Sequence, residues 1–169
     1  MRKSFFYFCF LISSLSISNR ANAQEVYNEI KSNAAAAASN PSANKMIKEI
    51  NQFKVDALEY LAIKMREQMS DSTTTYLDKQ AYAMNTFINY YIQTIIDNQD
   101  MPAAYQKKSL QLFFDISLSN PLFKDEDKDI VHAYLNSGSI MMFSLDTDWR
   151  IASAAVALEM KKLNSKVAK

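Results

Sequence analysis

The feature that most constrains the fold of this chain is its almost complete lack of glycine. Gly138 is the single glycine among 169 residues, whereas soluble proteins contain roughly 7% glycine on average. Tight phosphate-binding loops and most two-residue hairpin turns need glycine, because glycine adopts positive φ angles without steric cost. The sequence contains no P-loop, no GxGxxG turn and no GxSxG nucleophile elbow. The common nucleotide-binding and serine-hydrolase motifs are therefore excluded.

The N-terminus has the three parts of an export signal. Two basic residues precede an apolar run over residues 5–17, and residues 21–23 (Ala-Asn-Ala) supply the small-x-small pattern that signal peptidases read. The apolar run is shorter than the roughly 20 residues that span a bilayer. We therefore expect a signal peptide over residues 1–23 and a single α-helical domain over residues 24–169.

Removal of this signal leaves a mature chain without a thiol, because Cys9 is the only cysteine and lies inside the apolar run. Disulfides, thiolate metal sites and cysteine nucleophiles are then excluded. The signal contains three basic residues and no acidic one, so the mature chain is nearly neutral. It has no basic stripe to bind a phosphate backbone, and we expect no nucleic-acid partner. An exported domain without disulfides fits the periplasm or the exterior of a bacterium.

Apolar residues recur at helical spacing along most of the mature chain, and no strand-like alternation of comparable length occurs. The predicted helices span residues 25–38, 43–69, 75–98, 102–118 and 147–163. A further short helix is predicted to begin with Asp125 as its cap and to end at Gly138. The pattern predicts an all-α fold, an antiparallel bundle of about five to six helices with no β-sheet.

Local signals mark further helix ends and the core. We expect Asn40 to cap the second helix with Pro41 in its first turn, and Thr75 and Asp78 to form a capping box at the start of the third. Five residues on the apolar faces are expected to be buried: Leu61, Met84, Ile88, Phe113 and Val156.

Two patterns resemble metal sites, and we assign a metal to neither. Asp129 and His132 have the D-x-x-H spacing of a di-iron helix, but the second such motif and the additional carboxylates are missing. The acidic run over residues 125–129 begins like a calcium loop, whereas Ile130 and Asn136 occupy the positions that need glycine and glutamate. We therefore expect no metal.

Methionine pairs at 65 and 69 and at 141 and 142 suggest copper(I), and a methionine with His132 suggests haem. We interpret these methionines as core residues, because none of the pairs lies in an exposed polar segment. The sequence also contains no marked nucleophile or carboxylate pair. We therefore predict no catalytic residue, no cofactor-binding residue and no cofactor.

Three apolar side chains lie away from the predicted seams of their helices. Tyr82 and Tyr90 are about 200° and about 120° from Met84 around the third helix, and Ile63 lies among charged residues. These three residues are candidates for a partner surface. The alternative is that the third helix is covered on two sides by the rest of the bundle.

Three segments of the sequence resemble small exported helical proteins of Gram-negative bacteria that have no assigned activity. These segments are LDKQAYAMNTFI, SNPLF followed by an acid-rich helix start, and FSLDTDW before the last helix. The similarity covers about residues 75–160. The resemblance implies a shared helical fold and assigns no functional residue.

Three functions of different classes follow from this pattern. The first is an exported all-α interaction or structural module without catalytic activity, whose partner is an envelope or extracellular protein. The second is a periplasmic carrier of an apolar small molecule, which needs a cavity lined by Phe113, Phe114, Tyr91 and methionines. The third is an enzyme with an unmarked carboxylate site. The first is the interpretation that we favour.

The export signal yields a direct prediction, cleavage between Ala23 and Gln24. N-terminal sequencing of the exported protein should therefore begin at Gln24. A product that retains residues 1–20, or that carries a fatty acid on Cys9, would contradict this prediction.

Overall fold

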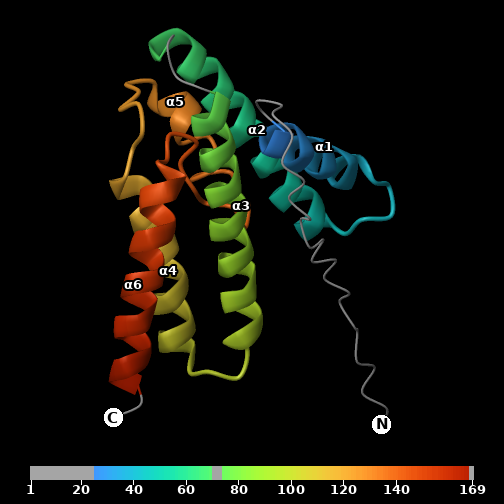
Figure 1. Cartoon of the computed structure of the whole chain (residues 1–169). Coiled ribbons are helices and arrows are strands. Elements are labelled where there is room, and N and C mark those ends of the chain that lie inside the picture. Colours follow the sequence, from blue (N-terminus) through green and yellow to red (C-terminus); the bar gives the residue numbers. More distant parts are fainter. Residues whose placement is uncertain (1–24, 70–73, 168–169) are drawn as a thin grey trace.

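The fold is built from α-helices, as the computed structural model of the chain shows (Figure 1). The structure describes residues 25–69 and 74–167. Its helices are α1 (Glu25–Ser39), α2 (Lys45–Gln68), α3 (Thr74–Asp97), α4 (Ala103–Ser119), α5 (Lys128–Val131) and α6 (Trp149–Val167). The described residues contain no strand. The predicted all-α bundle is confirmed.

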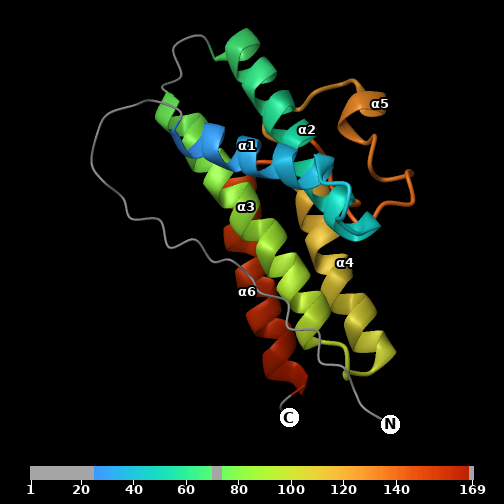
Figure 2. The ribbon, with the colours of Figure 1, turned by 90° about the vertical axis from the view of Figure 1, so that its right-hand side faces the viewer.

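Helix α3 is the central element, because it packs against α1, α2, α4 and α6. Helices α1 and α2 cover the N-terminal part of α3, α4 lies alongside its C-terminal part, and α6 follows α3 from Gln80 onward (Figures 1 and 2). Helix α4 runs antiparallel to both of its neighbours (Figure 1). Between α4 and α6 the chain passes through a long connection that contains only the short helix α5.

Part of this connection lies inside the core. All of residues 141–147 except Met142 are buried, although none of them is helical. Phe143 lies at the centre of the aromatic core, with its ring centroid 5.4 Å from that of Phe87 and 5.0 Å from that of Tyr91. Both pairs are edge-to-face, the geometry that the ring quadrupoles favour. The connection therefore supplies the middle of the core.

The apolar faces of the helices pack around this centre. All five residues predicted to be buried have no exposed surface: Leu61, Met84, Ile88, Phe113 and Val156. Their burial confirms the helical spacing from which they were predicted.

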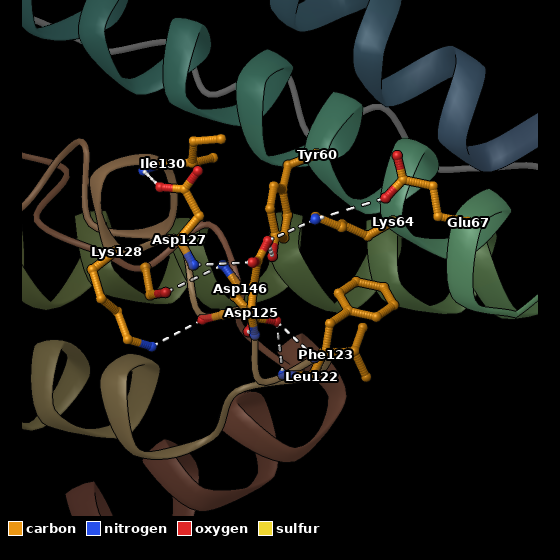
Figure 3. A network of polar contacts seen from close by, with 11 residues as sticks. Tyr60, Lys64, Glu67, Leu122, Phe123, Asp125, Asp127, Lys128, Ile130 and Asp146 are labelled. Carbon is orange, nitrogen blue, oxygen red and sulfur yellow. Dashed lines mark hydrogen bonds and ion pairs between the residues drawn. The ribbon is translucent and has the colours of Figure 1, made fainter.

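The carboxylate of Asp146 holds the buried segment against the chain that follows α4 (Figure 3). Asp146 is 2% exposed. One of its oxygens accepts the N–H groups of Leu122 and Phe123 at 3.1 and 2.7 Å, and the other accepts that of Asp125 at 2.9 Å. These donors compensate the cost of burying the charge.

Hydroxyl groups pair with one another and with a backbone N–H group in the same region. The Ser117 and Thr147 side-chain oxygens are 2.8 Å apart in a hydrogen bond, and the Ser144 N–H donates to the Ser117 hydroxyl at 3.0 Å. All three residues are buried. Buried polar groups that are paired in this way carry little cost.

Helix α6 begins at Trp149, two residues later than predicted. Asp148 caps it, because the Asp148 carboxylate accepts the N–H of Arg150 at 3.1 Å. Gln80, fully buried on α3, accepts the N–H of Trp149 at 2.9 Å and donates to Asp148 at 3.0 Å. A side chain of α3 therefore fixes the start of α6.

The predicted cap of the second helix, Asn40, is wrong, although the helix begins within two residues of the predicted position 43. Helix α2 is capped by Asn44, whose side-chain oxygen accepts the N–H of Ile47 at 2.9 Å. Asn40 instead accepts the N–H of Ser42 at 3.0 Å and stabilises a separate turn. Because this turn occupies Asn40, the helix begins only at Lys45.

The predicted extent of the fifth helix is also wrong. Helix α5 is a single turn, and its cap is Asp127, which accepts the N–H of Ile130 at 3.2 Å. Asp125 cannot cap it, because its side chain contacts α2 as described below. Gly138 has the expected left-handed conformation, with φ of 70°, but it lies in the loop after α5.

We expect Asp146→Asn to lower the free energy of unfolding by about 2–4 kcal/mol. An amide cannot accept all three N–H groups, and its own NH₂ would face one of these donors. Urea denaturation of the purified variant measures the loss. Asp97→Asn, on the exposed end of α3, is the control and should change stability by less than about 0.5 kcal/mol. Equal losses in the two variants would contradict the assigned role.

Candidate functional site

The structure places the three candidate partner residues in different surroundings. Ile63 on α2 and Tyr82 on α3 are exposed, at 51% and 57%. Tyr90 is partly buried, and its ring packs edge-to-face against Phe113 of α4 at a centroid distance of 5.3 Å. Burial raises the pKa of the Tyr90 hydroxyl. Tyr90 therefore lies at the rim of the core, and the other two side chains are accessible.

Tyr82 lines a groove between the first turns of α1 and α6 on the surface of α3. The groove has a volume of about 430 Å³ and a largely apolar surface. Its lining residues are Val26, Thr75, Asp78, Lys79, Tyr82, Ala83 and Arg150. We call it the Tyr82 groove.

Two polar contacts hold the walls of the Tyr82 groove in place. Asp78 does not form the predicted capping box, because Thr75 already lies within α3. Its carboxylate instead accepts the N–H of Tyr27 at 2.9 Å and attaches α1 to α3. On the other side, the Ser153 hydroxyl of α6 donates to the Ala83 carbonyl at 3.0 Å. The groove is therefore a built feature of three packed helices.

The groove also carries two cations that have no acidic partner among the residues that the structure describes. Arg150 lies over the ring of Tyr76, with its guanidinium 5.7 Å from the ring centroid. Neither Arg150 nor Lys79 forms an ion pair within the described residues. Asp78 is engaged with the backbone of α1. The surface of the groove is thus apolar and positively charged.

A second pocket, of about 130 Å³, lies where α1, α2 and α3 meet. Its lining residues are Ile30, Asn33, Ala34, Asn51, Lys54 and Asn85. The Lys54 ammonium donates to the side-chain oxygen of Asn85 at 2.7 Å. We call this cavity the Lys54 pocket.

Burial lowers the pKa of Lys54 from 10.5 to about 8, because a charged amine loses its hydration in the pocket. In the part of the chain that the structure describes, Lys54 forms no ion pair. Buried lysines are normally paired with a carboxylate. A titratable group with a perturbed pKa in a pocket is a candidate for a functional role.

The acidic run after α4 forms a structural network (Figure 3). The Asp125 carboxylate contacts the Lys64 ammonium at 2.9 Å and accepts the Tyr60 hydroxyl at 3.0 Å. The hydrogen bond from Lys64 lowers the pKa of Asp125, and burial beside Asp146 raises that of Tyr60. These contacts attach the loop before α5 to α2.

The residues considered as metal ligands lie in different surroundings. The backbone N–H of His132 closes the last turn of α5 by donating to the Lys128 carbonyl at 3.0 Å. Met65 and Met141 are buried in the core, as predicted, whereas Met69 is 37% exposed and Met142 is only partly buried, so the core interpretation is wrong for these two. Within the described residues, no three His, Cys, Asp or Glu side chains are placed to hold a metal ion together.

The aromatic residues considered for a carrier cavity pack against one another. Phe113 is fully buried, and its ring centroid is 5.4 Å from that of Tyr91. The Tyr91 hydroxyl donates to the Ile140 carbonyl at 3.0 Å, and burial raises its pKa to about 12. Phe114 packs on Phe143 at a centroid distance of 5.4 Å. Side chains thus fill this region, which does not favour a carrier cavity there.

Lys54 and Gln80 were not predicted from the sequence to be core or functional residues. Each follows or precedes a core residue in a helix, since Lys54 follows Phe53 and Gln80 precedes Ala81. A position next to the apolar stripe becomes buried when the helix is covered on two sides. Leu58 lies one turn after Lys54 on the same side of α2, and it is fully buried. An apolar residue at this position is the sequence signal that could have indicated a second covered face of α2.

No known protein family, curated protein or solved structure matches this chain. Among the helices of the described residues, none combines the length and the apolar character needed to cross a bilayer. The function must therefore be inferred from the geometry and chemistry of surface features such as the Tyr82 groove and the Lys54 pocket.

We predict that Lys54 makes stability depend on pH in a specific interval. Between about pH 8 and pH 10.5 the unfolded chain keeps a proton on Lys54 that the folded chain releases, so stability should rise with pH. Relative to Lys54→Met, the native chain should gain on the order of 3 kcal/mol across this interval. Urea denaturation at several pH values measures the difference.

Lys161→Met is the matched control, because Lys161 is exposed on α6. The difference between this variant and the native chain should remain nearly constant over the same pH interval. A constant difference for Lys54→Met as well would show that the Lys54 ammonium is not desolvated.

Proposed function

We propose that the mature chain is an exported, non-catalytic all-α module that binds a protein of the cell envelope or exterior through the Tyr82 groove. The partner segment places an apolar side chain against Tyr82 and Val26. A carboxylate of the same segment pairs with Arg150 or Lys79. The export signal over residues 1–23 supports the assigned compartment.

The observation that carries this proposal is an exposed aromatic ring in a groove whose two cations form no ion pair with any described residue. Tyr82 provides a large rigid contact surface and a polar hydroxyl that keeps the free protein soluble. Ile151, next to Arg150 on the first turn of α6, adds a second apolar side chain that is 55% exposed. Apolar contact surfaces of this kind are typical of binding sites.

The use of the buried carboxylates supports a non-catalytic role. Asp146 binds backbone N–H groups, and Asp125 binds Lys64 and Tyr60. Both groups hold loops in place. A general acid or base must instead reach a substrate.

Photo-crosslinking tests the proposed contact surface. A photoreactive residue at Tyr82 should yield an adduct with one envelope protein, because the residue lies in the proposed contact. The same residue at Leu118, which is exposed on α4, should not. The captured protein, once purified, should bind the native chain and should bind Tyr82→Ser at least about tenfold more weakly. Arg150→Glu should weaken the same complex, since it reverses a charge in the groove.

Stability measurements separate a binding role of Tyr82 from a packing role. Tyr82→Ser should change the free energy of unfolding by less than about 0.5 kcal/mol. Tyr90→Ser should lower it by about 1–3 kcal/mol, because the ring of Tyr90 packs on Phe113. Equal adducts from positions 82 and 118, or loss of stability in Tyr82→Ser with binding retained, would contradict the proposed function.

A further inference from the structure

Lys54 is a partly buried cation that has no acidic partner among the described residues. Three acidic side chains of α2 and α3 are engaged elsewhere. Glu59 pairs with Lys31 at 2.9 Å, Asp56 accepts a tyrosine hydroxyl, and Asp78 accepts a backbone N–H of α1. No acidic residue lines the Lys54 pocket. The pocket therefore attracts an anion from outside the chain.

The pocket offers several hydrogen-bond donors to such an anion. The Lys54 ammonium has three N–H donors, and Asn85 accepts one of them. The side-chain NH₂ groups of Asn33 and Asn85 donate to no partner within the described residues, whereas that of Asn51 donates to the Ile47 carbonyl at 2.8 Å. A carboxylate bound to an ammonium and a neutral amide forms charge-assisted hydrogen bonds.

Size and charge restrict the ligand to a small monoanion. The volume of about 130 Å³ equals that of roughly four water molecules, well below the roughly 300 Å³ of the smallest pockets for drug-sized ligands. The single ammonium balances one negative charge, and the lining contains no arginine for a phosphate. Ile30 and Ala34 supply apolar contacts for a short alkyl group.

We propose that the Lys54 pocket binds a short-chain monocarboxylate of about two to four carbons. The carboxylate accepts hydrogen bonds from Lys54 and from the side-chain amides of Asn33 and Asn85, and its alkyl group packs against Ile30 and Ala34. This site shares no lining residue with the Tyr82 groove. It therefore stands independently of the proposed protein contact.

NMR titration of the mature protein at pH 6.5 and constant ionic strength tests the proposal. Acetate, propionate and butyrate are the probes, and inorganic phosphate and chloride are the comparison anions. The carboxylates should shift the side-chain amide signals of Asn33 and Asn85 in a saturable manner. We expect dissociation constants of about 0.1–10 mM, the range for ligands of so few atoms.

Three variants assign the binding to the pocket. Lys54→Met should abolish the saturable shifts. Asn33→Leu changes an exposed residue of the rim and should weaken binding at least about threefold while the thermal unfolding of the chain is preserved. Lys161→Met, which removes an exposed lysine of α6, should leave the affinity unchanged.

Each other outcome overturns the proposal in a defined way. Equal saturation by phosphate would show that the pocket selects charge alone and would overturn the carboxylate assignment. Absence of saturation with all three carboxylates, or saturation retained in Lys54→Met, would overturn the site. If Lys54→Met fails to fold, Asn33→Leu decides, and an unchanged affinity in that variant overturns the proposal.

Discussion

The buried carboxylate of Asp146 is the interaction on which the rest of the structure depends. It joins two irregular parts of the chain that are 21 to 24 positions apart in sequence. Its oxygens accept backbone N–H groups that no helix or sheet pairs. Because those N–H groups are paired, residues 141–147 can enter the core. Phe143 then lies among rings from α2, α3 and α4. Without the carboxylate, three buried donors would lose their acceptor.

Much of the fold could be predicted from the sequence, because each long helix has a regular spacing of apolar residues within its own segment. In α2, α3 and α4 the apolar spacing placed both ends within a few residues of the structure. Residues 141–147 could not be predicted in the same way. The sequence around Asp146 has the composition of a helix start, and its burial depends on contacts with Leu122 and Phe123, far from it in sequence.

The candidate sites were predictable only in part, for a related reason. Tyr82 and Tyr90 both lie off the predicted seam of α3, yet one is exposed and the other packs on Phe113. The angle around a single helix does not show which neighbour covers that face. For Lys54 the sequence predicts exposure, because a lysine in a helix normally faces water, but the structure partly buries it. Its burial follows from the position of α1 across α2 and α3.

Residues 141–147, which supply the middle of the core, lie near the C-terminal end of the sequence. This position affects when the chain can fold during synthesis. The contact between Ser139 and Glu49, 90 positions apart, forms only after the chain has been made as far as Ser139, and that between Trp149 and Gln80, 69 positions apart, only after Trp149 has been added. Until then, the helices α2 and α3 lack the rings that complete their core. Such non-local contacts slow folding. A chain that passes through a translocation channel before it folds, as the proposed export requires, benefits from this delay.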